Sequence, residues 1–213
     1  LPMIKAMGGR NIFFAKDSRD DATTPWQVRL PLLKDLLVTQ SYIGIVKYHE
    51  GESIDWPTDE NKSNCKSTEE QYLIPYGKLM LQNHDLNVNE FEKPWLEVGG
   101  EDHDLDVVIN RTTRYITSHH HMQELLHPFL NSRSGFVGTE PEWEFFCKTI
   151  APIRFVKTDN LLGLAEVINK AKAFVGNQSC ALAIAEGLKK TIVQETCKWI
   201  PNCWFSREGF YTF

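Results

Sequence analysis

The sequence predicts an α/β protein, and three observations support this fold class. Short apolar runs alternate with helix-like segments of roughly 10–15 residues. At 213 residues the chain is long enough for one α/β domain or two small ones. An acidic, turn-rich stretch at residues 99–104 separates a weakly patterned N-terminal part from a regular C-terminal part. We therefore expect two domains, residues 1–103 and residues 104–213.

The first residues read as a helix already under way. Pro2 suits the first helical turn, and Gly8 or Gly9 would end the helix. In an α/β domain such a helix follows a strand and a loop. We therefore expect the sequence to be shortened at its N-terminus, so that the first domain lacks its first strand.

The rest of the N-terminal part offers few regular elements. We expect a strand at residues 11–16, a helix at 30–37 and a strand at 42–48. Residues 49–71 are acidic and polar, which is typical of a surface excursion. Residues 71–97 are interrupted by Pro and Gly, and we expect irregular structure with short helical pieces.

The C-terminal part alternates regularly between strand and helix. The expected strands are residues 106–110, 135–139, 153–156, 173–176 and 191–194, and the expected helices are residues 119–130, 140–150, 160–171 and 179–189. This alternation predicts right-handed βαβ units and a parallel sheet, as in a doubly wound, Rossmann-like domain. Such sheets bind ligands beyond the carboxyl ends of their strands, so polar residues that follow strands are site candidates.

Composition and charge argue against several classes of partner. No apolar run approaches the roughly 20 residues that cross a bilayer, so we expect no integral membrane segment. The net charge is −5 and no dense run of Lys and Arg occurs, which disfavours nucleic acid as a partner. The five cysteines are widely spaced without a CxxC pair, which indicates reduced thiols and a cytoplasmic protein.

The turn Gly176-Asn177-Gln178-Ser179 lies between an expected strand and an expected helix. A helix N-terminus presents unpaired backbone N–H groups and the positive end of the helix dipole, which together bind phosphate. Gly176 would let the backbone approach a ligand, and Asn177 and Ser179 would add hydrogen bonds. The alternative is that Asn177 or Ser179 only caps the helix. The sequence leaves both interpretations open.

Arg111 and Arg114 follow the first strand of the C-terminal part, in NRTTRY. A guanidinium at this edge of the sheet can hold a phosphate or a carboxylate through two hydrogen bonds. The alternative for Arg111 is a surface salt bridge with Asp104 or Asp106.

Two carboxylates are further candidates. Glu195 comes just after a strand, where it has no helix to cap and is suited to accept hydrogen bonds from ribose hydroxyls. Glu140 begins a helix, where an acid complements the dipole. A contact between Glu140 and a ribose or a base is the alternative.

The segment SHHHMQELLH invites a zinc interpretation. In a helix, His120, Glu124 and His127 would share one face. The opposite face would be apolar, made of Met122, Leu125, Leu126 and Phe129. Consecutive imidazoles point about 100° apart on a helix, so three adjacent histidines do not bind one ion. We favour a solvated polar face over a zinc site and expect no metal. No nucleophile elbow, phosphate-binding P-loop or GxGxxG motif occurs.

The stretch FVGNQSCALAIAEGLKKTIVQE resembles the C-terminal signature of glycosyltransferase family 9, the heptosyltransferase-like enzymes. In that family a strand, a small-residue turn and an Ala-rich helix hold the nucleotide diphosphate of a sugar donor. LPMIKAMGG is similar to the family's opening helix. The resemblance is good in order and spacing over residues 106–196 and thin over residues 1–105. It implies a GT-B-like fold of two Rossmann-like domains.

The resemblance also implies roles for individual residues. The turn at residues 176–179 would hold the donor pyrophosphate, Glu195 would approach its ribose, and Arg111 would clamp a phosphate. Asn177 stands where the family usually has an acid, and Ser179 near where it has Gly. The implied reaction is sugar transfer from a nucleotide-sugar to an acceptor hydroxyl, inverting and independent of metal, with no further cofactor. The catalytic base would lie upstream of Leu1. The rival expectation is a non-catalytic nucleotide- or sugar-binding or structural protein of the same fold.

Overall fold

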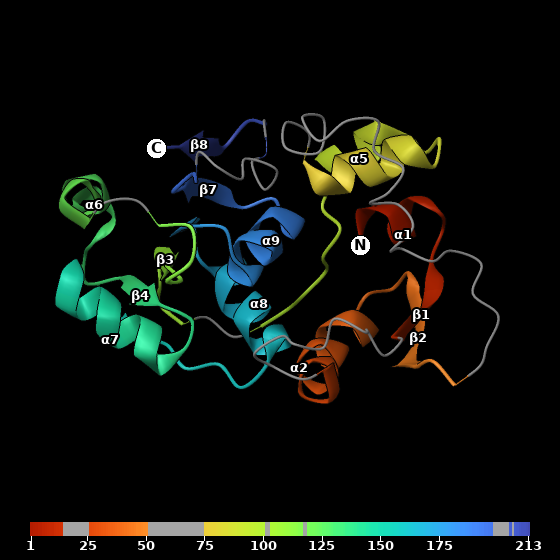
Figure 1. Ribbon diagram of the computed structural model, residues 1–213, viewed down its shortest axis with the longest axis horizontal. Helices are drawn as coiled ribbons and strands as arrows, with labels where there is room; N and C mark the ends of the chain where they lie inside the picture. Colours follow the sequence, from red (N-terminus) through yellow and green to blue (C-terminus); the bar gives the residue numbers. More distant parts are fainter. Residues whose placement is uncertain (15–25, 51–74, 101–102, 117–118, 198–204, 206) are drawn as a thin grey trace. The chain divides into compact units, whose positions relative to one another are not determined.

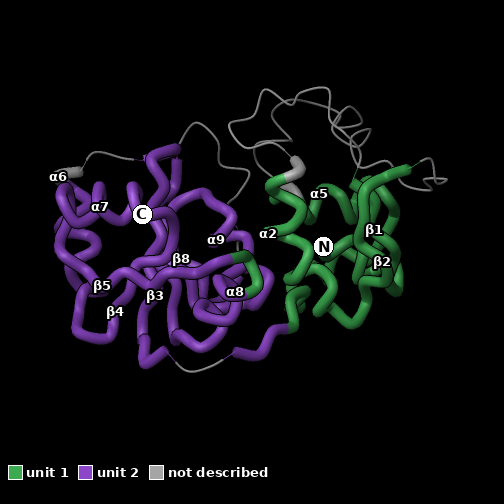
Figure 2. The backbone as a smooth tube through the Cα atoms, turned by 90° about the horizontal axis from the view of Figure 1, so that it is seen from below, with its two compact units in different colours: residues 1–97, 160–162 green, residues 98–159, 163–213 purple. Residues whose placement is uncertain are grey.

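The computed structural model describes residues 1–14, 26–50, 75–100, 103–116, 119–197, 205 and 207–213 (Figure 1). The chain forms two compact units (Figure 2). Unit 1 comprises residues 1–97 and 160–162, and unit 2 comprises residues 98–159 and 163–213. From the sequence we expect the boundary between residues 103 and 104. The acidic excursion expected at residues 49–71 lies mostly outside the described residues.

Unit 1 has a two-stranded parallel sheet with short helices. Its elements are α1 (Pro2–Ala6), β1 (Arg10–Phe14), α2 (Trp26–Val38), β2 (Ile43–Tyr48), α5 (Tyr76–Asn83) and the 3₁₀ helix η1 (Val88–Glu92). β1 pairs with β2. The short helical pieces predicted in residues 71–97 are confirmed by α5 and η1. α2 begins at Trp26, before the predicted start at residue 30, and it contains Pro31.

The helix predicted at the first residues is confirmed as α1. Pro2 occupies the first turn of α1, and Gly8 and Gly9 follow the helix with φ of 76° and 93°. Residues other than Gly rarely adopt these angles. A Cβ atom at Gly9 would also collide with the carbonyl oxygen of Tyr42. The chain thus needs glycine here to leave α1 and enter β1.

The carboxylate of Glu97 connects the segment that leads out of unit 1 to α1 and to the turn between α2 and β2. Glu97 Oε1 lies 2.9 Å from Lys5 Nζ, and Glu97 Oε2 accepts a hydrogen bond of 3.0 Å from Ser41 Oγ. The backbone N–H of Glu97 donates to Gln40 Oε1 at 2.8 Å. The hydrogen bonds from Lys5 and Ser41 hold the pKa of Glu97 below its usual range.

Unit 2 has a six-stranded, all-parallel sheet. Its strands are β3 (Val107–Asn110), β4 (Ser134–Phe136), β5 (Arg154–Phe155), β6 (Ala173–Gly176), β7 (Thr191–Gln194) and β8 (Phe210–Thr212), in the order β5-β4-β3-β6-β7-β8. Its helices are α6 (His119–Leu126), the 3₁₀ helix η2 (His127–Phe129), α7 (Glu140–Thr149), α8 (Leu161–Lys170) and α9 (Cys180–Gly187). This mixed α/β unit is compatible with a Rossmann-like fold.

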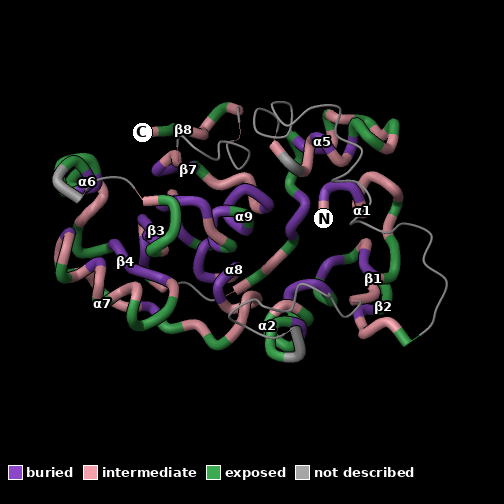
Figure 3. Tube along the Cα trace, viewed as in Figure 1, coloured by how far each residue is buried: buried purple, intermediate pink, exposed green. Residues whose placement is uncertain are grey.

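The helices cover both faces of this sheet. α6 and α7 lie on one side, and α8 and α9 lie on the other (Figure 1). The side chains of Met122 and Leu126 from α6 and Phe146 from α7 pack against Ile109 and Val175 of the sheet. β3, β6 and much of α8 and α9 are buried (Figure 3). Parallel sheets are normally buried on both faces, which explains why their strands read as short, continuous apolar runs.

Several elements of unit 2 are shorter than predicted, such as β4, and the unit differs most from the sequence predictions in two places. The helix expected at residues 119–130 ends at Leu126 and continues as η2, since Pro128 lacks the N–H that an α-helix would need. The second difference is at the C-terminus. Residues 210–212 form β8 and extend the sheet beside β7, whereas the sequence predicted no strand there.

β8 is anchored by a buried carboxylate. Glu186 of α9 is fully buried and pairs with Arg207, which precedes β8. Arg207 Nε donates a hydrogen bond of 2.9 Å to Glu186 Oε2, and Arg207 Nη2 lies 2.8 Å from the same oxygen. Lys189 forms a second ion pair with Glu186. Arg207 also donates to the carbonyl oxygen of Lys190 at 2.7 Å. Glu186 thus ties the C-terminal strand to the end of α9.

Candidate functional site at the carboxyl edge of the unit 2 sheet

The strand order of unit 2 contains one reversal within the described sheet. From β3 the chain adds β4 and β5 on one side, then returns to add β6, β7 and β8 on the other side of β3. β3 and β6 are therefore the neighbours between which the direction changes. In open α/β sheets the loops that leave such a pair of strands diverge and leave a crevice for a ligand. Here these loops are residues 111–116, after β3, and the turn at residues 177–179, after β6.

Gly176 ends β6 directly opposite Asn110 of β3. A Cβ atom at residue 176 would collide with the carbonyl oxygen of Asn110. From the sequence, Gly176 was expected to let the backbone approach a ligand. The neighbouring strand already requires a glycine at this position.

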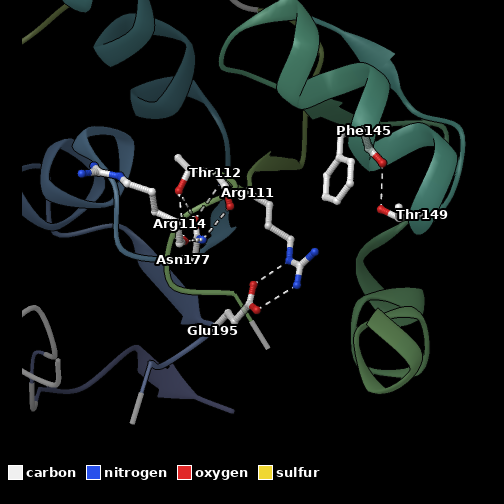
Figure 4. Close-up of polar contacts among 7 residues, drawn as sticks. All are labelled: Arg111, Thr112, Arg114, Phe145, Thr149, Asn177 and Glu195. Carbon is white, nitrogen blue, oxygen red and sulfur yellow. Dashed lines mark hydrogen bonds and ion pairs between the residues drawn. The ribbon is translucent and has the colours of Figure 1, made fainter. Parts of the chain in front are cut away.

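Asn177 ties the two loops together (Figure 4). Its side chain is completely buried. Its Oδ1 accepts hydrogen bonds from the backbone N–H of Thr112 at 2.9 Å and from Thr112 Oγ1 at 3.3 Å, and its Nδ2 donates to the carbonyl oxygens of Thr112 at 3.0 Å and Arg114 at 2.6 Å. The amide of Asn177 is thereby fully used within the protein. It sets the conformation of the loop after β3.

Ser179 is the N-cap of α9. Its hydroxyl accepts a hydrogen bond of 3.1 Å from the backbone N–H of Leu182. The capping interpretation of the turn is confirmed for Ser179. A single cap satisfies only part of the first helical turn, so the N-terminus of α9 retains N–H groups and the positive end of its dipole. Gln178, between Asn177 and Ser179, is also buried.

Arg111 and Glu195 bind each other (Figure 4). Arg111 Nε lies 2.6 Å from Glu195 Oε2, and its Nη2 lies 2.9 Å from Oε1. The two side chains are 3% and 1% exposed, so this two-point ion pair is removed from water. The structure therefore brings together two predicted site residues, each directed at the other. Asp104 and Asp106, the surface partners considered for Arg111, both form ion pairs with Arg133.

Arg114 differs from Arg111 in its surroundings. Its side chain is exposed and points away from the Arg111–Glu195 pair (Figure 4). Its guanidinium lies over the ring of Tyr115, 5.6 Å from the ring centroid. Tyr115 is itself 37% exposed and has a φ of 55°. For a bulky residue this left-handed conformation is uncommon, and it turns the loop just after the arginine.

Buried acceptors lie at the same edge of the sheet. Asn110 ends β3 and Gln194 ends β7, and both side chains are at least nine-tenths buried. Asn110 Nδ2 donates to the carbonyl oxygen of Val137 at 2.8 Å. Within the described part of the chain, Asn110 Oδ1 and Gln194 Oε1 receive no hydrogen bond. Gln194 was not among the residues predicted for the site. The sequence feature that could have identified Gln194 is its position as a polar residue at the end of the apolar strand TIVQ.

Glu140 is the exposed first residue of α7. The cap of that helix is made by its neighbours. Thr139 Oγ1 accepts a hydrogen bond of 3.4 Å from the N–H of Glu142, and Glu142 Oε2 accepts one of 3.0 Å from the N–H of Thr139. This capping box agrees with the dipole explanation for acids in the first turn. Among the described residues, Glu140 makes no hydrogen bond or ion pair with the loops at residues 111–116 or 177–179.

The apolar face predicted for α6 is partly confirmed. Met122 and Leu126 are buried, and Phe129 packs against the same core. Leu125 is 42% exposed, so the prediction was wrong for this residue. His127 lies in η2, which ends the α-helical spacing that would align it with Glu124. The side chains of His119 and His120 are not described. Among the described residues, no three His, Cys, Asp or Glu side chains are placed to hold a metal ion.

Unit 1 carries a separate, shallow hollow of about 380 Å³. It is lined by Gly8, Gly9, Arg10, Asn11 and residues 41–44, at the amino ends of β1 and β2. Asn11 Oδ1 accepts a hydrogen bond from the N–H of Ile45. Ligand sites in parallel sheets lie at the opposite ends of the strands, so this hollow is the weaker candidate.

Comparison of the chain with protein-family models, curated proteins and solved structures gives no match. Among the described helices none has both the length and the apolar character needed to cross a membrane.

Proposed function

We propose that unit 2 binds a nucleotide-sugar and that the chain transfers the sugar to an acceptor hydroxyl, as a glycosyltransferase with a GT-B-like arrangement. One observation carries the proposal. The turn that resembles the donor-binding signature of glycosyltransferase family 9 leaves β6 next to β3, where the strand order reverses, and it leads into the N-terminus of α9. Doubly wound sheets bind nucleotides at such a position.

The chemistry of this edge suits a diphosphate and a sugar. The N-terminus of α9 offers N–H donors and a positive dipole end to phosphate oxygens. The same groups would stabilise the negative charge that develops on the diphosphate as it leaves the sugar. Asn110 Oδ1 and Gln194 Oε1 are buried acceptors, which favours hydroxyl groups of ribose or sugar as partners.

The second candidate is a nucleotide- or sugar-binding protein without catalysis. The Arg111–Glu195 pair favours it, because these two residues neutralise each other and are buried. Glu195 would then not accept hydrogen bonds from a ribose. Hydrolysis or transfer assays on a nucleotide-sugar separate the two candidates once binding is established.

The test of the site uses a change that preserves the helix cap. In Ser179→Asp the new carboxylate replaces the serine hydroxyl as the cap of α9, because Asp and Ser are equally good N-cap residues. The carboxylate also places a negative charge where the phosphates would bind. The matched control is Asn131→Asp. Asn131 Oδ1 accepts a hydrogen bond from the N–H of Arg133 just before β4, at the opposite edge of the same sheet. Both variants carry the same added charge.

The measurement is thermal unfolding of the full chain with ADP, GDP, UDP, CDP or dTDP. A diphosphate at about 100 times its Kd stabilises the folded state by about 2.7 kcal/mol. We expect stabilisation of the wild type and of Asn131→Asp by at least one of the five, and none of Ser179→Asp. If no diphosphate stabilises the wild type, or if Ser179→Asp responds like the control, the proposed site is wrong.

A further inference from the structure

β8 is held firmly at its amino end. Arg207, which precedes the strand, binds the buried carboxylate of Glu186 and the carbonyl oxygen of Lys190. The N–H of Ile192 donates a hydrogen bond of 2.8 Å to the carbonyl oxygen of Gly209, directly before β8. Withdrawing Arg207 would take a cationic partner from a buried carboxylate, which is strongly unfavourable. This end of β8 therefore stays in place.

The side chains beside β8 change character along the strand. Residues in register on neighbouring parallel strands point to the same face of the sheet, and every second residue of a strand returns to that face. The row that contains the first residue of β8 is apolar and consists of Val108, Phe174, Ile192 and Phe210. The next row on this face is polar or lacks a side chain and consists of Asn110, Gly176, Gln194 and Thr212. The apolar packing on this face therefore ends before the strand does.

The carboxyl end of β8 closes beside two unpaired polar atoms. The N–H of Phe213 donates a hydrogen bond of 3.0 Å to the carbonyl oxygen of Gln194, and the N–H of Thr196 donates one of 3.0 Å to the carbonyl oxygen of Phe213. The ring of Phe213 is partly buried against the core beneath α6 and α7. Among the described residues, Gln194 Oε1 and Thr196 Oγ1 are buried here without a hydrogen bond. Burying an unpaired polar atom is unfavourable, and exposure to water removes that cost.

We propose that residues 211–213 form a strap, which opens away from β7 while the amino end of β8 stays anchored. Opening breaks the two hydrogen bonds of Phe213 and lets water reach the unpaired oxygens of Gln194 and Thr196. These two residues flank Glu195 in the chain, so the strap is a conformational device at the border of the candidate site. It goes beyond the proposed function, because its opening requires no nucleotide.

The test is amide hydrogen exchange of the full chain, followed by NMR without ligand. The N–H of Thr196 donates to β8, whereas the N–H of Glu195 donates to the carbonyl oxygen of Gly176 on β6 at 2.9 Å. Glu195 therefore reports separation of β7 from β6 at the same edge, and Ile192 reports the amino end of β8. We expect the protection factors of Thr196 and Phe213 to lie below those of Glu195 and Ile192 by about tenfold or more.

Thr196→Val tests the cause, since valine has nearly the same shape without the hydroxyl. Removing this unpaired atom should raise the protection factors of residues 196 and 213 by about threefold or more and leave that of Ile192 unchanged. Thr191→Val, at the exposed start of β7, is the matched control and should change none of them. A smaller difference than tenfold in the wild type, or no gain in Thr196→Val, overturns the inference. Because the test contains no nucleotide, either result leaves the proposed function standing.

Discussion

The side chain of Asn177 makes hydrogen bonds to the backbone of Thr112 in both directions. It accepts from the N–H at 2.9 Å and donates to the carbonyl oxygen at 3.0 Å. The two residues are 65 positions apart in the sequence. This pairing imitates the exchange of hydrogen bonds between strands, but it is made by a side chain beyond the ends of β3 and β6. It joins the two loops that frame the proposed site.

Asn177→Ala should destabilise the protein substantially. It removes a buried amide and leaves the N–H of Thr112 and two carbonyl oxygens without their partner in a partly buried setting, which we expect to cost about 2–4 kcal/mol of unfolding free energy. Denaturant unfolding measures the change. Asn131→Ala removes an exposed acceptor from one backbone N–H and serves as the control, with an expected cost below about 1 kcal/mol. Equal costs for the two variants would show that Asn177 does not hold the loop.

The Arg111–Glu195 pair predicts strong coupling in a double-mutant cycle. Arg111→Met and Glu195→Leu should each cost about 3–5 kcal/mol, because each leaves a buried charge without its partner. The double variant should cost much less than the sum. Lys93→Met with Glu90→Leu gives the comparison for an exposed pair, 2.6 Å apart, with a coupling below about 1 kcal/mol. Additive costs at Arg111 and Glu195 would contradict the buried pair.

Arg207→Met should loosen β8 without unfolding unit 2. Glu186 keeps Lys189 as a partner, so we expect a cost of about 2–4 kcal/mol. The readout is amide exchange of Ile192 and Phe213, whose N–H groups donate to the carbonyl oxygens of Gly209 and Gln194. Both should exchange faster. Lys172→Met, which removes an exposed ion pair, is the control. Unchanged protection in Arg207→Met would mean that β8 is held by its strand contacts alone.

The contacts of Glu97 predict a small pH dependence of stability in unit 1. Lys5 and Ser41 lower the pKa of Glu97 in the folded state, so its contribution is complete above the ordinary value near 4.5 and is lost as the pH falls through the lowered pKa. Glu97→Gln should therefore cost less than about 1 kcal/mol at pH 7, since the pair is half exposed.

The measurement compares wild type and Glu97→Gln from pH 7 down to pH 3. The difference in unfolding free energy should shrink towards acidic pH and at high salt. A difference that is constant with pH would exclude an ionic origin. Glu92→Gln, which alters a more distant ion pair of 3.9 Å with Lys78, provides the control.

Sequence patterns predicted the elements of unit 2 where the apolar run and the residues that border it are both distinct. Residues 173–176 and 191–194 were predicted with the bounds of β6 and β7, because each is a short apolar run bordered by small or polar residues. β8 was missed because its aromatic residues carry no alternation, and its position depends on Arg207 and Glu186. Such anchoring between distant residues leaves no local signal.

The difference between local sequence features and contacts of distant residues also applies to the site. The turn at residues 176–179 was recognisable because a glycine and small polar residues joined a strand to a helix, and Ser179 is indeed the cap. The partners of Arg111 and Asn177 were not recognisable, since they lie 84 and 65 positions away. For each side chain a contact with a ligand was one of two interpretations, beside a helix cap for Asn177 and a salt bridge for Arg111. The structure uses them to fix the protein itself.

The most direct test of the central claim is a two-dimensional ¹H–¹⁵N NMR titration of the full chain with the five nucleoside diphosphates. We predict that the amide signals of residues 111–115 and 178–182 shift most for at least one of them, because these loops frame the reversal in strand order. Signals at the amino ends of β3 and β6 should stay in place. Shifts confined to other parts of the chain, or no shifts with any of the five at millimolar concentration, would contradict a nucleotide site between β3 and β6.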